Sequence, residues 1–399
     1  MDNRNNRNNR STSSSQTQRN NTHNSPQRRT QKSYRPYDTS NTTTIVAVLI
    51  MAALFVNYNI FSKVIIKTVP EADYSKYDNV QSKENGKDPE QQKREKRLAD
   101  IAENYTAVQA LQADTKCGEL ILINKLCAYD FDARSALFPH EFPVSIYENK
   151  NDVYTVKNIN LSLNKTAINA LNALLSDFVN TTGNRDIIIV DGHRTFEMQQ
   201  LVLQAKISQY GEEQGRLIAT NPGYSEHHTG YALDLSLFVN GRYEEYYGQG
   251  IYDWITKNCY KYGFVIRYPE GKTNITGIEY EPWHLRYVGL PHAYQMTKEG
   301  LCLEEYIDRL AYYPIESDRL TISAPDGTYE VYTVPVAADM TEVKVPKNLP
   351  YTLSGDNCGH IVVTIKKSDS PNEDLLQQRY EEQALLQEQQ TAEQNAVTE

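Results

Sequence analysis

The chain has 399 residues, a formal net charge of -10 and a pI of about 5.4. Its length allows one large domain with attachments or two modest domains. Its acidity gives no overall support to a nucleic-acid partner. Residues 1–43 depart from this average, because they carry eight basic residues against two acidic ones. They are rich in Asn, Arg, Ser, Thr and Gln with almost no aliphatic residues, so we expect a disordered segment.

An apolar run, IVAVLIMAALFV, begins at Ile45. With its edges it reaches the roughly 20 residues that a bilayer core requires. The long polar leader and the lack of a cleavage site after the run favour an anchor over a cleaved signal peptide. We predict a transmembrane signal anchor at 44–61, with 1–43 in the cytoplasm and the rest outside the cell. A partly helical stalk at 62–114 follows, because 82–105 is charged and mildly periodic.

The segment 115–312 mixes helical and strand patterns. Apolar residues recur at helical spacing in 165–180, and further helices are expected at 195–210 and 252–262. Short apolar or β-branched runs predict strands at 186–190, 231–238, 264–268 and 283–288. Strands and helices do not alternate regularly, so we expect an α+β domain with mixed helices around a small antiparallel sheet.

The pattern changes after residue 310. Alternation at 329–334 behind an Asp326-Gly327 turn, and a β-branched run at 361–365, predict a small all-β appendage at 313–368. The Gln- and Glu-rich residues 369–399 are expected to form a solvated tail. No C-x-x-C pair occurs among the five cysteines, for which we favour buried free thiols. Cys117 and Cys127 are the easiest local pair for a disulfide.

Four of the eight histidines fall in three short patches: DGHR at 191–194, SEHHTGYALD at 225–234 and EPWH at 281–284. A catalytic zinc takes three His or carboxylate ligands and keeps one position open, and His227, Asp234 and His284 offer such a set. Glu281 supplies a proton acceptor and Arg194 a fixed cation for an oxyanion. Spacing alone leaves open that each histidine is an ordinary core or surface residue.

The pattern S-x-H-x-x-G-x-A-x-D at 225–234, followed by E-P-W-H, resembles the VanY type of D-alanyl-D-alanine carboxypeptidase, within the M15 zinc peptidases. Residues 191–195, 263–269 and 281–289 also resemble the family, and the likeness covers roughly 117–310. His193 stands where the family more often has Tyr, and His228 matches no family role.

The resemblance implies a role for each of seven residues. It implies Zn²⁺ as the cofactor, with His227, Asp234 and His284 as its ligands. Glu281 would be the general base and Arg194 the residue that polarises the carbonyl. Ser225 and Gln199 match positions that hold the substrate peptide.

The function implied is removal of the C-terminal D-Ala from peptidoglycan stem peptides at the D-Ala-D-Ala bond, outside the membrane. A first alternative is an LD-carboxypeptidase acting on tetrapeptide stems, which shares these motifs. A second is a non-catalytic wall-binding scaffold, although such a protein would be expected to lack a ligand or the base. The sequence says nothing about the oligomeric state.

Overall fold

The computed structural model describes residues 88–138 and 142–369, so the predicted segments 1–43 and 44–61 and nearly all of the tail 369–399 lie outside it. In the described ranges, no helix is both long and apolar enough to cross a bilayer. The first element is α2 (Pro89–Asn104), where the Asp88 carboxylate caps the helix by accepting a hydrogen bond from the Glu90 amide. None of its side chains is buried, as suits a charged helix in the predicted stalk.

A six-stranded and mostly antiparallel sheet occupies the centre of the segment predicted to carry the metal. The strands run in the order β3-β5-β6-β9-β8, β7 pairs with β6, and β3 and β5 are parallel. Their bounds are β3 (Thr155–Val156), β5 (Ile187–Asp191), β6 (Ala232–Val239), β7 (Arg242–Glu244), β8 (Phe264–Ile266) and β9 (His284–Tyr287). The four strands predicted here are therefore confirmed as β5, β6, β8 and β9. A separate two-stranded ladder joins β2 (Val144–Ser145) to β4 (Ser162–Leu163), on either side of the short helix α3 (Ile146–Asn149).

Helix α4 (Lys165–Thr182) covers this sheet and confirms the helix predicted from apolar spacing. The Asn164 side chain caps its first turn, and Gly183 ends it in a left-handed conformation. Its buried face joins one core with β5, β6 and β9, which α7 (Asp253–Asn258) also enters through Ile255. The helix predicted at 252–262 is α7 followed by a tighter 3-10 turn, η5 (Cys259–Tyr262).

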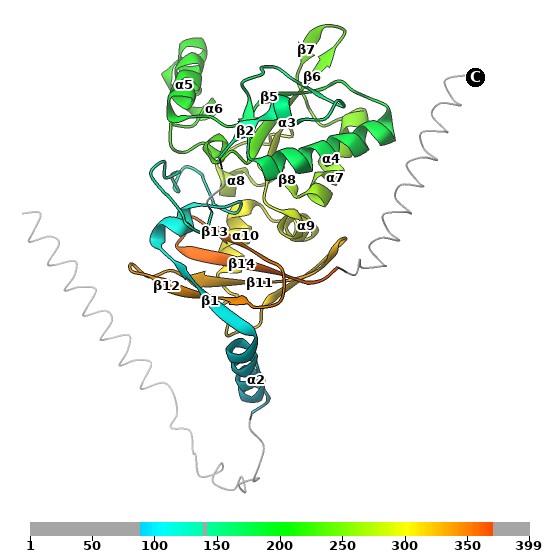
Figure 1. Ribbon diagram of the computed structural model, residues 1–399. Helices are drawn as coiled ribbons and strands as arrows, with labels where there is room; N and C mark the ends of the chain where they lie inside the picture. The colour runs from blue at the N-terminus through cyan, green and yellow to red at the C-terminus, as the bar shows by residue number, and fades with distance from the viewer. Residues whose placement is uncertain (1–87, 139–141, 370–399) are drawn as a thin grey trace, which may run out of the picture. The chain divides into compact units, whose positions relative to one another are not determined.

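Helices α5 (Phe196–Tyr210) and α6 (Glu212–Ile218) form a hairpin that extends away from the sheet (Figure 1). Thr195 caps α5 by accepting a hydrogen bond from the Met198 amide. Only Gln199 and Leu203 are buried on α5. This hairpin leads from the end of β5 to the histidine-rich patch.

The C-terminal part is an antiparallel sheet in the order β10-β11-β14-β13, confirming the all-β prediction. Its strands are β10 (Leu320–Ala324), β11 (Gly327–Pro335), β13 (Tyr351–Gly355) and β14 (His360–Ser368). Gly327 already pairs with Ala324, so the β10–β11 turn is Pro325-Asp326, one residue earlier than predicted.

One strand pair differs from the expectation for the stalk. Residues 105–110 form β1 (Tyr105–Ala110), which pairs along its length with β12 (Thr341–Pro346). The sequence predicted stalk there, because the partner of this short strand lies more than 200 residues away and leaves no local signal. The end of the segment 62–114 is thus part of the β-rich region.

The β-rich region shares a hydrophobic core with the region that contains the six-stranded sheet. Helices α9 (Leu290–Glu299) and α10 (Leu303–Leu310) lie between them (Figure 1), and their core side chains pack with those of β10, β11 and β14. Val265 of β8 and Leu120 belong to the same core. A sheet of about 50 residues is near the lower limit for a core of its own, which explains the shared packing.

Candidate metal centre

Neighbouring strands place two of the predicted site residues, Asp234 and His284, in a row across the sheet with Asp191. Asp191 is paired with Asp234 between β5 and β6, and Asp234 is paired with His284 between β6 and β9. Opposed residues on adjacent strands point their side chains to the same face. The sheet itself therefore brings Asp234 to His284, whose Nδ1 lies 3.1 Å from the Asp234 Oδ1.

His227 reaches the same point from the 3-10 helix η3 (Glu226–Thr229), just before β6. Gly230 ends η3 with φ 71°, and a Cβ there would lie 3.0 Å from the Pro143 Cγ. Glycine suits this left-handed and crowded position. The His227 Nδ1 lies 2.7 Å from the Gly192 carbonyl oxygen, so Nδ1 carries the proton and donates it. The Nε2 lone pair is thereby left for the metal, 3.5 Å from the Asp234 Oδ2.

The donor set fits a zinc ion. His227, Asp234 and His284 each offer one ligand atom within 4.8 Å of the others, and both histidines are buried. Asp234 Oδ1 is buried and lacks a well-directed hydrogen bond from any described residue. Two imidazole nitrogens and one carboxylate oxygen around such an atom are a common catalytic zinc set. The structure thus brings the three predicted ligands together.

Glu281 lies beside this cluster, with Oε2 3.8 Å from the His284 Nδ1. Burial raises the pKa of Glu281 to about 7, with Asp234 adding to the rise and His284 and Arg194 opposing it. Burial lowers the pKa of His284, but the carboxylates of Asp234 and Glu226 outweigh it and raise that pKa to about 9. A carboxyl group with a pKa near 7 can both accept and return a proton at neutral pH.

Arg194 is held at the edge of the cluster by two partners. Its Nη2 lies 2.6 Å from the Asp191 Oδ2, and its Nη1 donates to the Gln199 Oε1 over 2.9 Å. Nη2 is also 3.7 Å from the Asp234 Oδ2. These carboxylates outweigh burial and raise the pKa of Arg194, which therefore stays a cation.

The two residues expected to hold substrate lie in the same cavity but differ in their contacts. The cavity has a volume of about 350 Å³, and Ser225, Gln199, Trp283 and the catalytic candidates line it. The Gln199 amide is engaged by Arg194 and by the Thr220 carbonyl, to which Nε2 donates over 2.9 Å. Ser225 is buried and lines this space, and its hydroxyl makes no hydrogen bond to a residue in 88–138 or 142–369. Their roles toward a substrate stay predictions.

A buried network of charged groups supports His284, and sequence reasoning missed it. The Glu226 Oε2 lies 3.6 Å from the His284 Nε2, and Glu226 Oε1 accepts hydrogen bonds from Arg267 and Arg286, each over 2.6 Å. These arginines outweigh burial and lower the pKa of Glu226, so the carboxylate stays charged. An anion behind Nε2 fixes the orientation of the imidazole and directs Nδ1 to the metal.

The same network continues to α10 and to the segment around residue 120. Arg267 makes a second, bidentate pair with Glu304 of α10. Arg286 also donates to the carbonyls of Glu119 and Ile121. The signal for both arginines was present in the resembling runs GFVIRYP and EPWHLRYVG, where a charged residue interrupts an apolar strand.

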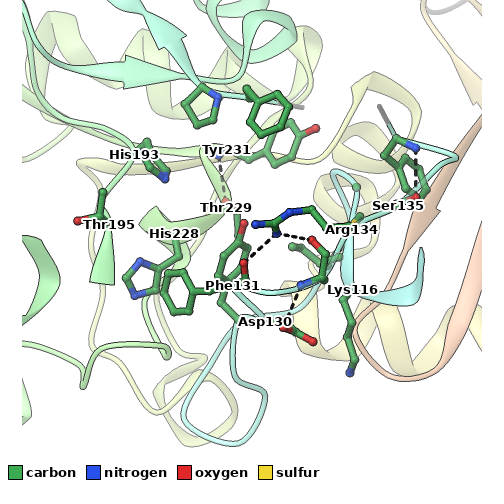
Figure 2. A pocket seen from close by; sticks show the side chains of 18 residues that line it. Lys116, Asp130, Phe131, Arg134, Ser135, His193, Thr195, His228, Thr229 and Tyr231 are labelled. Carbon is green, nitrogen blue, oxygen red and sulfur yellow. Dashed lines mark hydrogen bonds between the residues drawn. The ribbon is translucent and has the colours of Figure 1, made fainter. Parts of the chain in front are cut away.

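His228, the rival ligand, has a structural role. Its Nδ1 donates to the Arg194 carbonyl over 2.7 Å, and its Nε2 accepts from the Gly223 amide over 3.0 Å, so neither nitrogen is free for a metal. Its ring packs against Phe131 in a second cavity of about 380 Å³ (Figure 2). His193, the residue that departs from the family pattern, lines this second cavity and not the one around the candidate metal ligands.

Comparisons with known sequences agree with this geometry. A sequence model of the family described as "VanY: D-alanyl-D-alanine carboxypeptidase" matches residues 160–290. A D-alanyl-D-alanine carboxypeptidase of Enterococcus faecium is 36% identical over 212 residues, which cover 53% of this chain and 64% of that protein. The bifunctional D-Ala-D-Ala dipeptidase and D-Ala-D-Ala carboxypeptidase VanXYC of Enterococcus gallinarum is 39% identical over 138 residues, 33% of this chain and 73% of that protein. The chain thus spans slightly less than two thirds of the first relative's length.

A solved structure shows the same fold. The vancomycin resistance D,D-dipeptidase VanXYg, in complex with a D-Ala-D-Ala phosphinate analogue, superimposes with a TM-score of 0.57 and 29% identity. The match covers 66% of this chain and 99% of that chain. It extends the similarity well beyond the motif residues.

Proposed function

Because this chain belongs to the VanY family of D-alanyl-D-alanine carboxypeptidases, we propose that it removes the C-terminal D-Ala from peptidoglycan stem peptides. The bond cut is the D-Ala-D-Ala amide of a pentapeptide stem. The observation that carries the proposal is one cavity holding the three donors His227, Asp234 and His284 with Glu281 and Arg194. A non-catalytic scaffold is disfavoured, because none of these roles is missing.

His227, Asp234 and His284 would hold the zinc ion. Zinc in such a site supplies Lewis-acid chemistry, namely an activated water nucleophile and a polarised scissile carbonyl. Glu226 and the Gly192 carbonyl orient the two histidines from behind. The carboxylates of Asp234 and Glu226 favour a cation at this point.

Glu281 moves the proton. With a pKa of about 7 it takes a proton from the attacking water and returns it to the amine of the departing D-Ala. Zinc binding will lower this pKa, since a nearby cation favours the carboxylate. The loss of activity that follows from protonation of Glu281 is therefore expected at a pH below 7.

Arg194 stabilises the oxyanion that develops when the amide carbonyl becomes tetrahedral. Asp191 and Gln199 fix its guanidinium before substrate arrives, so no reorganisation is needed during the reaction. The free Ser225 hydroxyl on the cavity wall donates a hydrogen bond to the substrate peptide.

We further propose that the domain works outside the cell, held by the anchor at 44–61. The apolar run, the basic residues before it and the charged α2 after the anchor support this arrangement. Protease added to intact cells should remove the catalytic region and leave an N-terminal fragment. Full protection of the chain in intact cells would contradict this topology.

The substrate test compares two stem peptides. The full chain is used, because a fragment ending near 315 would remove β10–β14 and expose the shared core. Zinc-loaded protein in detergent is incubated with a pentapeptide ending in D-Ala-D-Ala and with the matching tetrapeptide, and D-Ala release is followed by mass. We expect kcat/KM for the pentapeptide to be at least about tenfold higher, a difference of roughly 1.4 kcal/mol in transition-state binding.

Faster release from the tetrapeptide would make the protein an LD-carboxypeptidase. No release from either peptide by protein with one bound zinc would overturn the proposal. Glu281→Gln, which keeps the cavity shape, is the blank for contaminating peptidases.

A further inference from the structure

Two loops that are distant in sequence, 122–128 and 356–359, are hydrogen-bonded to each other. Asn357, on the turn between β13 and β14, makes two of these hydrogen bonds. The Asn357 side-chain amide donates to the carbonyls of Leu122 and Ala128, over 2.8 and 3.0 Å. The Leu122 amide in turn donates to the Asp356 carbonyl over 3.1 Å. Residues 122–128 and the turn 356–359 are therefore held together by their backbones as well as by one side chain.

This arrangement places two cysteines next to each other. Cys127 precedes Ala128, and Cys358 follows Asn357, so both flank the same set of hydrogen bonds. The Asn124 side chain fixes the position of Cys127 by accepting from its amide over 3.0 Å, and Asp356 does the same for Cys358 over 2.7 Å. Burial raises the pKa of Cys358, and the nearby Cys127 thiol also helps to raise it.

The pair also differs from the other cysteines in access. Cys358 is exposed and Cys127 is partly buried, whereas Cys259 and Cys302 are buried. Cys117 is also partly buried, and its thiol lies 3.6 Å from the Ala113 carbonyl. A soluble oxidant can therefore reach the Cys127–Cys358 pair.

We propose that Cys127 and Cys358 form a disulfide that ties the β13–β14 turn to the loop 124–128. Two S–H bonds break and one S–S bond forms, with the loss of two protons and two electrons. A small-molecule disulfide, or the disulfide of a thiol–disulfide oxidoreductase, takes up both and becomes two thiols. The proposal concerns neither zinc nor catalysis, and it relies on the proposed location only for an oxidising environment.

The cross-link would stabilise the loop 124–128, which leads to residues that pack beside the candidate metal site. The loop 124–128 leads into Tyr129 and Phe131, which pack on His228 next to the ligand His227. Asn124 at the start of the loop donates to Glu304, the partner of Arg267. Because the closed loop spans most of the folded region, the bond restricts the unfolded chain strongly.

The test maps disulfides in the full chain. Purified protein is equilibrated at pH 8.5 in a mixture of oxidised and reduced glutathione, because burial, Asp356 and Cys127 raise the pKa of Cys358 to about 12 and slow its oxidation. Free thiols are alkylated, and the digest is analysed without reduction. We expect a peptide pair joined through Cys127 and Cys358, with the other three cysteines alkylated. Reduction should lower the Tm by about 5 °C.

Cysteine variants distinguish the Cys127–Cys358 disulfide from a disulfide between Cys117 and Cys127. Cys127→Ser and Cys358→Ser should each abolish the linked peptide and the effect of reductant on Tm. Cys117→Ser, the matched control, should keep both. The proposal is wrong if Cys127 and Cys358 are both alkylated in the oxidising buffer, or if Cys127 is found joined to Cys117. D-Ala release by the reduced protein at 25 °C should be unchanged, which keeps this result independent of the proposed activity.

Discussion

Two regions of the molecule each contain a buried histidine, and they use it in opposite ways. The first is the candidate metal site, called the charged region below. There His284 is 4% exposed and faces Asp234 and Glu226, which raise its pKa to about 9. The second is the contact of α9 with α10 and β14, called the neutral region below. There His292 of α9 is 1% exposed and contacts the hydroxyls of Tyr306 and Thr364, over 2.8 and 2.9 Å. Burial alone lowers its pKa to about 3.

The difference shows that burial of a histidine does not make a site. His292 has both nitrogens occupied by hydroxyl groups, so it completes a core and offers nothing to a ligand. His284 has a carboxylate behind Nε2 and a second carboxylate beside Nδ1, so a cation is favoured at that point. Changes in the charged region should therefore reduce activity or metal binding, and a change at His292 should alter only stability.

The largest expected effect in the charged region is at Glu281. Glu281→Gln should lower kcat for D-Ala release by about 10²–10⁴-fold, because the variant has no general base. Zinc content should stay at one per chain. Glu279→Gln, an exposed neighbour, is the control and should be fully active. Equal activity of the Glu281 variant and the wild type would remove Glu281 from the mechanism.

Arg194 comes next. Arg194→Met should reduce kcat by about 10²–10³-fold, the usual loss when one oxyanion-stabilising group is removed. Zinc binding should persist, because Arg194 is not a ligand. Arg216→Met, which breaks an exposed pair with Glu212, serves as the control. A change confined to KM would assign Arg194 to substrate binding and not to the transition state.

Glu226 should affect the metal more than the chemistry. Glu226→Gln keeps the shape but leaves Arg267 and Arg286 without their shared anion, and it weakens the support behind His284. We expect zinc affinity to fall by about 10–100-fold, measured by competition with a chelating dye. Glu212→Gln on the surface should bind zinc like the wild type. Unchanged affinity in the Glu226 variant would show that the network does not orient the ligand.

The sequence predicts some parts of the candidate site and of the fold and misses others. Motif spacing and resemblance predicted the three candidate ligands and Glu281, and the structure brings these side chains together in one cavity. Glu226 was missed, since a carboxylate before a ligand histidine is expected to be solvated unless its buried partners are known. The pairing of β1 with β12 was also missed, because no local pattern records a contact between residues so far apart.

The smallest effect concerns His292 and the stability of the protein. Its folded-state pKa lies below the unfolded value, so only the unfolded chain takes up a proton as the pH falls below about 6.5. The wild type should therefore lose about 2 kcal/mol of unfolding free energy from this group between pH 7 and pH 5. His292→Gln should show a shallower loss in urea unfolding at those two pH values.

His360 provides a control of opposite sign. Asp356 raises its pKa above the ordinary value, so protonation stabilises the folded state as the pH falls. His360→Gln should therefore lose stability more steeply toward low pH than the wild type. If both variants changed the pH dependence in the same direction, the contrast drawn for the buried histidine would be wrong.

The most direct test of the central claim measures zinc and hydrolysis together. Zinc content and D-Ala release from the pentapeptide are measured for the wild type and for His284→Ala. Each protein is measured before chelation, after chelation, and after one equivalent of zinc has been added back. We expect the wild type to hold one zinc, to lose activity on chelation and to regain it, and His284→Ala to show neither zinc nor activity. Undiminished D-Ala release by chelated, zinc-free protein would contradict a metal site built from His227, Asp234 and His284.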